Sequence, residues 1–290
     1  MATMLRRKKR TLTDLEQTAL RALVEAAKYE IIPLKNARDQ AAFLPPGSVV
    51  TVTASPSHGI DATFDLCEYL TTLDLLTVVP HLSAHMIADR AKLADLLARA
   101  KDLGFTKAFV IGGDPAEQTD FDDAYALLTA MEEVGHPFAE IGIGAYPDGH
   151  VDIPRDVLAK ALHDKERFAG YMATQMCFDP GAIGSWLAAT RADGVALPMH
   201  LGIPGVADIT KLMTIAARIG VGDSAKFLKK NRSLIGSVIT GKFGPDGILE
   251  ALAPVLADPA SNATALHVFT FNQVEATVAW RQRMLDRLSG

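Results

Sequence analysis

The sequence predicts an α/β fold, a (β/α)8 TIM barrel with an N-terminal helix and extra helices between strands 7 and 8. Three observations predict it: short apolar or β-branched runs occur eight times, helix-like segments separate them, and polar residues follow many of the runs. Alternation of strands and helices is typical of a parallel sheet, and about 250 residues are enough for one barrel. The main competitor is a doubly wound sheet, but no GxGxxG motif follows the first strand.

The first element is a helix that leads into the first strand. Thr13 and Glu16 have the spacing of a capping box, and apolar residues then recur at helical spacing through Leu20, Leu23 and Val24. The apolar run 29–34 follows as the first strand. Residues 1–12 contain the basic run 6–10 and are predicted to form a disordered basic tail, with phosphate or membrane binding as the alternative. Residues 13–290 are predicted to form one catalytic domain.

The other strands and helices follow in regular alternation. The remaining predicted strands span residues 49–54, 76–82, 108–113, 141–146, 171–178, 196–203 and 265–271. Helix-like segments between them include 86–103, 122–134, 154–168, 182–191 and 206–219. The interval between the last two strands is too long for one crossover helix, so further helices are predicted there, including 224–234 and 245–256.

Composition excludes several classes of function. A net charge of −5 argues against general nucleic-acid binding, and no apolar stretch approaches the roughly 20 residues of a membrane helix. We therefore expect a cytoplasmic protein with a small-molecule substrate. Cys67 and Cys177 lack CxxC spacing and are predicted to be buried apolar residues. The histidines at strand ends, His81, His150 and His200, lie on separate strands without a familiar carboxylate partner, so no metal site is predicted.

Glu30 is the most informative residue, because it is a carboxylate inside the apolar first strand. An unpaired ionised carboxylate buried there would cost several kcal/mol or shift its pKa upward. The residue is therefore either neutralised by a partner, as an ion-paired glutamate at a strand end, or used for proton chemistry.

Polar residues also follow the other predicted strands. In barrels of this type the active site lies at the C-terminal ends of the strands. The polar residues at these ends are Thr51, Thr53, His81, Asp114, Tyr146, His150, Gln175, His200, Thr270 and Asn272. Gly112 and Gly113 would allow a ligand to approach the backbone closely, and the alternative is a tight turn capped by Asp114.

An ordered series of short motifs resembles the methylenetetrahydrofolate reductase family over about residues 25–285. The motifs are Tyr29-Glu30-Ile31-Ile32-Pro33, Val52-Thr53, Pro80-His81-Leu82, Gly113-Asp114, Ala145-Tyr146-Pro147 with His150, Thr174-Gln175, and His267 through Asn272. The resemblance implies reduction of 5,10-methylenetetrahydrofolate to 5-methyltetrahydrofolate. It also implies that Glu30 is the general acid that protonates N10 and that Asp114 and Gln175 hydrogen-bond the pterin.

On this basis, two further groups of residues are assigned to the site. Thr53 and Asn272 are expected to bind the folate substrate together with Asp114 and Gln175. His81, Gly112, Gly113, Tyr146 and His150 are expected to bind the cofactor.

The sequence also departs from the family at positions that contact the flavin. Most members carry FAD, but Gly112 replaces a common basic residue, Glu166 aligns with a lysine, Ile209 with an aromatic residue and Gln273 with a basic residue. Because a pyrophosphate loses affinity without cationic partners, FAD is expected to be absent. NADH or NADPH would then pass its hydride directly to the folate.

Three alternatives remain open: an FAD-dependent reductase, a lyase or aldolase with Lys35 as the Schiff-base residue, and a folate-binding protein without turnover. Candidate partners for the folate tail or the nucleotide phosphates are Lys35, Lys242, Arg281 and Arg283. The sequence predicts neither the oligomeric state nor a choice between NADH and NADPH.

Overall fold

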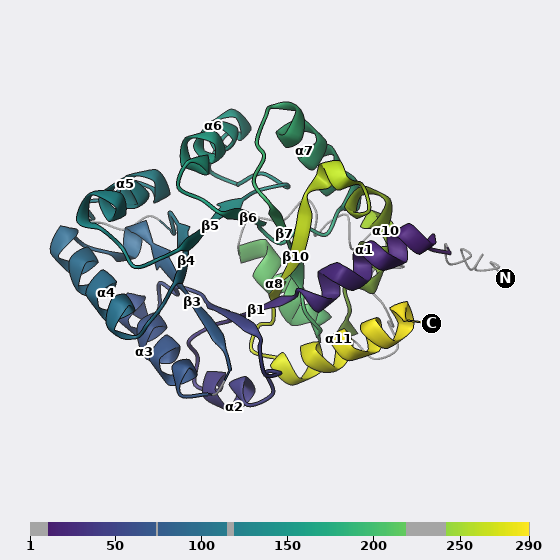
Figure 1. The fold of residues 1–290 in the computed structure, drawn as a ribbon, viewed down its shortest axis with the longest axis horizontal. Helices are drawn as coiled ribbons and strands as arrows, with labels where there is room; N and C mark the ends of the chain where they lie inside the picture. Colours follow the sequence, from purple (N-terminus) through teal and green to yellow (C-terminus); the bar gives the residue numbers. More distant parts are fainter. Residues whose placement is uncertain (1–10, 74, 115–118, 219–241, 290) are drawn as a thin grey trace.

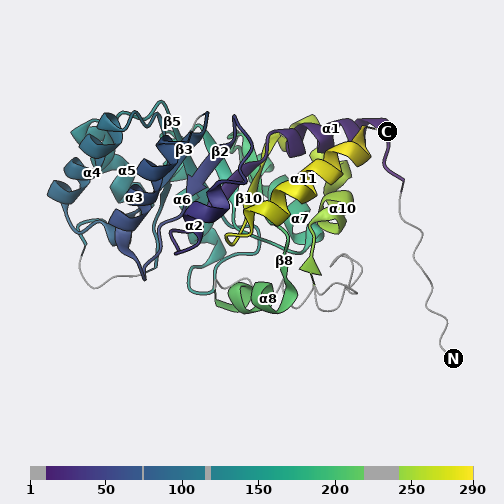
Figure 2. The same cartoon turned by 90° about the horizontal axis from the view of Figure 1, so that it is seen from below.

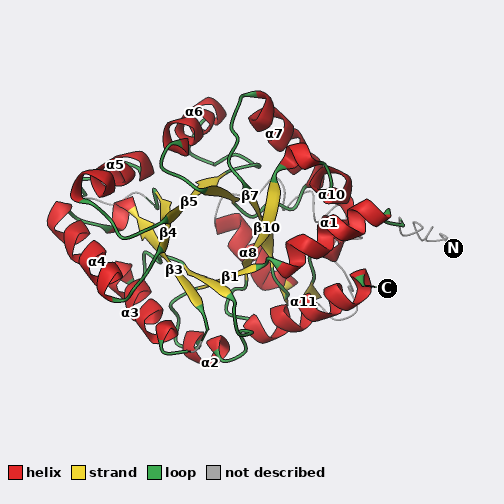
Figure 3. Ribbon diagram, viewed as in Figure 1, coloured by secondary structure: helices red, strands yellow, loops and turns green. Residues whose placement is uncertain are grey.

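The computed structural model describes residues 11–73, 75–114, 119–218 and 242–289. Within these residues, eight parallel strands close into a barrel in the order β1-β10-β7-β6-β5-β4-β3-β2. Figures 1 and 3 show the strands at the centre of the molecule. The strands are β1 (Lys28–Ile31), β2 (Val49–Val52), β3 (Thr77–Ser83), β4 (Lys107–Ile111), β5 (Glu140–Ala145), β6 (Tyr171–Thr174), β7 (Met199–Pro204) and β10 (Ala263–Phe269). The predicted (β/α)8 barrel is confirmed.

Helices form a ring outside the strands (Figure 3). They are α1 (Asp14–Glu25), α2 (Ala37–Ala41), α3 (Gly59–Thr71), α4 (Arg90–Asp102), α5 (Ala124–Val134), α6 (Arg155–Glu166), α7 (Pro180–Ala192), α10 (Asp246–Leu256) and α11 (Val274–Leu288), whereas α8 (Ile209–Arg218) lies at one end of the barrel (Figure 2). The described chain also contains the short 3-10 helices η1 (Ala84–Met86) and η4 (Pro259–Ser261). None of the helices in the described ranges combines the length and the apolar character needed to cross a bilayer.

Side-chain caps fix where several helices begin. The predicted capping box is present at α1, where Glu16 N–H donates to Thr13 Oγ1 and Thr13 N–H donates to Glu16 Oε2. Asp89 and Asp123 accept backbone N–H groups at the starts of α4 and α5. Because of these caps, α4 begins four residues later and α5 two residues later than the hydrophobic pattern alone predicts.

The first and sixth strands are shorter than predicted because the chain leaves the ladder at the barrel mouth. β1 ends at Ile31, where the pattern predicted 34, and β6 ends at Thr174, where it predicted 178. The N–H of Gln175 makes one more bond, to the carbonyl of Ala145 at 2.7 Å. The residues that follow Gln175 can therefore line the mouth of the barrel.

The segment between β7 and β10 carries extra structure, as predicted. β8 (Ala207–Asp208) and β9 (Lys242–Phe243) form an antiparallel pair, and α10 matches the predicted helix at 245–256. The predicted helix at 224–234 lies outside the described residues. Figure 2 shows α8 at the end of the barrel opposite α1.

The predicted basic tail lies almost entirely outside the described residues. Its last member, Leu12, packs against the hydrophobic core, and its carbonyl accepts a hydrogen bond from Gln17. Leu12 therefore contacts the barrel domain, although it was assigned to the tail.

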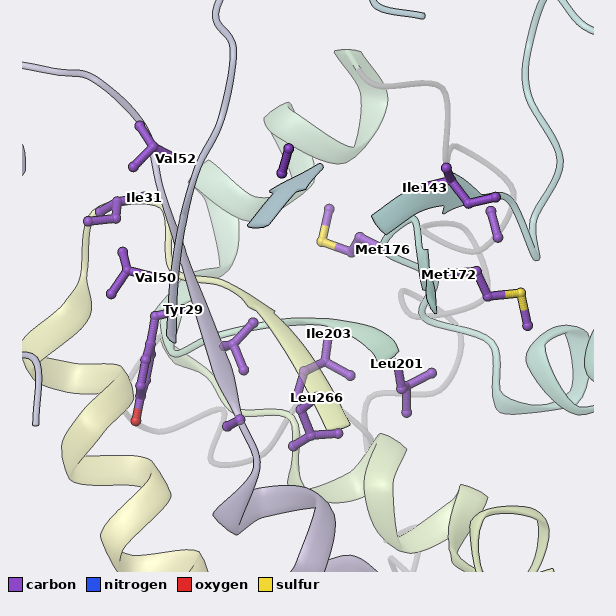
Figure 4. Packing of buried hydrophobic residues seen from close by; sticks show 14 of the residues in the cluster. Tyr29, Ile31, Val50, Val52, Ile143, Met172, Met176, Leu201, Ile203 and Leu266 are labelled. Carbon is purple, nitrogen blue, oxygen red and sulfur yellow. The ribbon is translucent and has the colours of Figure 1, made fainter. Parts of the chain in front are cut away.

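Alternation along the strands builds two layers of core. Tyr29 and Ile31 on β1 belong to the large cluster between strands and helices, with residues such as Val50 and Leu266 (Figure 4). A smaller cluster of Val79, Phe109, Tyr171 and Ala173 is separate from it. Because successive side chains on a strand point to opposite faces, Lys28 and Glu30 face the barrel axis. Both cysteines are buried, as predicted for Cys67 and Cys177, and neither is part of a disulfide bond.

Candidate active site

A cavity of about 470 Å³ lies at the C-terminal ends of the barrel strands. Six of the ten residues assigned to the site from the sequence line it: Glu30, Thr53, His81, Asp114, Tyr146 and Gln175. They come from β1 and β3 and from the loops after β2, β4, β5 and β6. Ile215 of α8 also contributes to the wall. These six side chains, which come from separate strand ends, therefore do converge on one cavity, as predicted.

Glu30 lies in this cavity with a partner that the sequence analysis did not identify. His267 Nε2 lies 3.0 Å from Glu30 Oε2, and the glutamate side chain is 13% exposed. His81 Nε2 lies 3.9 Å from the same oxygen. Glu30 thus has a partner, as one of the two interpretations offered for it requires, and its side chain is also open to the cavity.

The two histidines beside Glu30 are almost fully buried. Burial lowers the pKa of His81 to about 4, the charge of Glu30 opposes this shift, and His267 adds to it. His81 is therefore neutral near pH 7. Its Nε2 and the Nδ1 of His267 have no hydrogen-bond partner among the described residues.

The rest of the lining combines aromatic and apolar residues with a few hydroxyl groups, and it carries little charge. Phe109, Phe269 and Phe271 contribute ring faces, and the charged residues in the lining are the acids Glu30 and Asp114. No lysine or arginine of the described chain lines the cavity. Burial raises the pKa of Tyr146, and the charge of Asp114 adds to the shift, so its phenol remains a neutral hydrogen-bond donor.

Gly112 and Gly113 form the turn that presents Asp114, and they do not line the cavity. Gly113 has a φ of +85°, and a Cβ there would overlap the hydroxyl of Ser83. The carbonyl of Gly112 accepts the N–H of His85 at 2.9 Å. The structure therefore favours the tight-turn alternative over the assignment of these glycines to cofactor binding.

Asn272 also has a different place from the one assigned to it. It is 3% exposed, lies outside the cavity lining, and clamps the end of the first strand. Its Oδ1 accepts the N–H of Ile32 at 2.9 Å, and its Nδ2 donates to the Ile32 carbonyl at 2.9 Å and to Asn36 Oδ1 at 3.2 Å. With its amide used in this way, Asn272 holds the backbone beside Glu30 and makes no contact with the cavity.

Two histidines of the predicted strand ends lie away from the cavity wall. His150 accepts the N–H of Asp152 at 3.1 Å, and its ring packs edge-on against Tyr146. His200 is the second residue of β7 and lies 3.3 Å from the amine of Lys28, so it belongs to the opposite end of the strands. Its prediction as a residue of the C-terminal strand end is wrong.

The structure shows where two candidate partners for the folate tail or the nucleotide phosphates lie. Arg281 donates to the carbonyls of Val24 and Glu25 at the end of α1, so its guanidinium is already used. Lys35 is exposed and does not line the cavity, so the Schiff-base alternative gains no support.

The chain is similar in sequence to proteins of one known family. Residues 34–283 match the family model described as methylenetetrahydrofolate reductase. The Methylenetetrahydrofolate reductase 1 of Schizosaccharomyces pombe is 26% identical over 194 residues, which cover 62% of this chain and 31% of the yeast protein. The chain therefore spans about a third of that curated relative. Glu30 itself lies just before the first residue that the family model matches.

Solved structures share the fold at low sequence identity. An uncharacterised protein from Clostridium thermocellum that binds two copies of 5-methyl-5,6,7,8-tetrahydrofolic acid has a TM-score of 0.64 and 12% identity, covering 95% of this chain and 100% of that one. A GH18 chitinase from Cycas revoluta has a TM-score of 0.53 and 10% identity, covering 91% and 100%. These likenesses show the barrel fold alone. Because the family model covers most of the sequence, the chain belongs to the methylenetetrahydrofolate reductase family.

Proposed function

We propose that this protein reduces 5,10-methylenetetrahydrofolate to 5-methyltetrahydrofolate with a hydride taken directly from NADH or NADPH, and that Glu30 is the general acid. The observation that carries the proposal is one cavity with the Glu30 carboxyl group in its wall and Asp114 and Gln175 beside it. Family membership supports the reaction class. The name of the yeast relative and the folate bound by the Clostridium protein agree with it.

The proposed reaction needs one proton and one hydride. Glu30 gives its proton to N10 of the folate, the bond between N10 and the methylene carbon breaks, and an iminium forms at N5. The hydride from C4 of the nicotinamide then adds to the methylene carbon, which becomes the methyl group, and the nicotinamide leaves oxidised. The resulting Glu30 carboxylate accepts a hydrogen bond from His267, which stabilises the charge left behind.

The lining of the cavity fits the flat rings of both reactants. Pterin and nicotinamide rings can stack on aromatic faces such as Phe109 and Phe269, and Asp114 and Gln175 offer hydrogen-bonding groups. Direct transfer requires the two reacting carbons to lie about 3 to 3.5 Å apart, so both rings must occupy the cavity together. Because the charged residues in the lining are acidic, the nucleotide phosphates and the folate tail are expected to extend outside it.

Three positions outside the cavity lining lack the cationic side chains that the resemblance associates with a bound flavin dinucleotide. Gly112 offers no side chain to a phosphate, and the Glu166 carboxylate accepts the N–H of Ala196 at 2.9 Å. Gln273 precedes α11 and is uncharged. None of these three side chains is itself a cation that could pair with a pyrophosphate, and this supports the proposal of flavin independence.

The test is NADH oxidation by the purified protein with methylenetetrahydrofolate, with and without added FAD. Full activity is expected without FAD, and Glu30→Gln is expected to lower kcat by at least about 100-fold, because general acid catalysis contributes about 10²- to 10⁴-fold. Folate binding should be retained, since glutamine keeps the size of the side chain. Glu140→Gln, on the first residue of β5 at the opposite strand end, is the matched control and should keep wild-type turnover.

Two results would favour the alternatives. Visible flavin absorbance in the purified protein, or activity that depends on added FAD, would identify an FAD-dependent reductase. Tight folate binding with no NADH or NADPH oxidation would identify a folate-binding protein without turnover.

A further inference from the structure

We propose that Glu30, His81 and His267 form a binding site for one divalent transition-metal ion of the Zn²⁺ type. The site lies in the wall of the barrel cavity, where β1, β3 and β10 bring the three side chains together. No metal site was predicted from the sequence, because His81, His150 and His200 lie on separate strands without a familiar carboxylate partner. Metal binding is independent of the proposed hydride transfer and goes beyond it.

The three side chains already have nearly the spacing that a metal requires. Their ligand atoms all lie within 4.8 Å of one another. Glu30 Oε2 is 3.0 Å from His267 Nε2 and 3.9 Å from His81 Nε2. Tetrahedral zinc with bonds of about 2.0 to 2.1 Å separates its ligands by about 3.3 Å. The observed distances bracket this value, so small side-chain rotations complete the set.

A buried and unpartnered nitrogen indicates that this cluster accepts a ligand. His81 is 2% exposed, and its Nε2 has no hydrogen-bond partner in the described part of the chain. That nitrogen faces the Glu30 carboxylate and the His267 ring. A buried polar atom without a partner costs free energy, and a metal ion would satisfy it while also pairing with the carboxylate.

The ligand types select the class of ion. Two imidazole nitrogens with one carboxylate suit zinc and other divalent transition metals, whereas magnesium and calcium prefer oxygen ligands alone. All three residues line the cavity, so a fourth position is open to water or another small ligand. Three protein ligands with an open position are typical of accessible zinc sites rather than of closed structural ones.

The surroundings of His267 limit the expected affinity. Histidine ligands usually donate their other ring N–H to a fixed acceptor, and the loss of such an acceptor costs about 10- to 100-fold in affinity. The Nδ1 of His267 has no partner among the described residues. We therefore expect reversible binding that a chelator removes.

Metal binding has a consequence for the proposed reaction. A Glu30 carboxylate bound to zinc cannot carry the proton for N10, so zinc should inhibit NADH oxidation. This consequence rests on the proposed function, whereas binding itself does not.

The experiment is a Zn²⁺ titration of the chelator-treated full chain, followed by calorimetry and by the melting temperature. We expect one ion per chain and a higher melting temperature with zinc. His81→Gln and His267→Gln should each weaken binding at least tenfold, because glutamine keeps a donor near Glu30 but lacks the imidazole ligand. The control is His163→Gln, which removes a partly exposed histidine 2.8 Å from Asp193 and 3.9 Å from Glu166, and it should bind zinc like the wild type.

The outcomes separate this proposal from the proposed function. No zinc binding by the wild type, or binding that survives both His81→Gln and His267→Gln, would overturn it. Loss of binding in His163→Gln alone would also overturn it, by placing the ion on the surface. If a variant does not fold, the visible spectrum of Co²⁺ bound to the wild type tests the site instead. Ligation by nitrogen and oxygen gives a visible band, and absence of this band would contradict the site. Zinc binding by a chain that shows no NADH oxidation even when zinc-free would contradict the reductase proposal and leave the metal site standing.

Discussion

Replacement of Asn272 by alanine distinguishes a structural clamp from a substrate ligand. The change removes three hydrogen bonds, to the N–H and carbonyl of Ile32 and to Asn36. At about 1 kcal/mol each these contribute about 3 kcal/mol, because the site is buried. The residue also has a φ of +54°, and alanine in the left-handed region costs about 1 kcal/mol more. The expected loss in the free energy of unfolding is therefore about 3 to 4 kcal/mol.

The matched control is Asn262→Ala, on the loop before β10. Asn262 also has a left-handed backbone, with a φ of +46°, but its exposed side chain makes one hydrogen bond, to the carbonyl of Ala196. Its replacement should cost about 1 to 2 kcal/mol. Urea unfolding of both variants measures the difference. If Asn272→Ala unfolds at the wild-type urea concentration while KM for the folate rises, the clamp is refuted and the role assigned from the sequence is correct.

Two further predictions follow from the barrel interior and the loop after β4. Burial lowers the pKa of His200 to about 2, and Lys28 adds to the shift, so the unfolded chain binds a proton below about pH 6.5 that the folded chain does not. The free energy of unfolding should therefore fall by about 1.4 kcal/mol per pH unit as the pH drops below about 6.5. Urea unfolding should show a smaller loss with falling pH in His200→Gln. Equal pH dependence in the variant and the wild type would contradict the lowered pKa of His200. Gly113→Ala should lower the melting temperature and raise KM for the folate, because the new Cβ overlaps Ser83 beneath Asp114. Gly104 has a φ of +72° and open space around it, so Gly104→Ala should introduce backbone strain alone. Equal effects of the two glycine variants on the melting temperature and on KM would refute the role of the overlap.

The barrel could be predicted because each strand and helix carries its own local signal. Apolar runs, helical spacing and the capping box at Thr13 all depend on neighbours in the sequence, and the structure has these elements within a few residues. Strand ends were less accurate, because hydrophobic residues such as Met176 and Phe178 continue past the last ladder bond of β6. Their burial comes from loops and helices that only the folded chain supplies.

The contents of the site were predicted less completely, because they depend on pairing across the closed barrel. Glu30 and His267 are separated by most of the chain and meet because β10 closes against β1. No local pattern in the sequence marks this contact. Asn272 was misplaced for a similar reason, since its partners lie on the chain after β1.

The most direct measurement of the central claim follows the hydride itself. NADH with deuterium at the transferred C4 position is oxidised in a single turnover with methylenetetrahydrofolate, and the product is examined by mass spectrometry. Direct transfer in the cavity of Glu30 predicts one deuterium in the methyl group of 5-methyltetrahydrofolate, with none lost to water. A product without deuterium would show that the hydride passed through an exchangeable carrier, and the account of two rings held together in this cavity would be wrong.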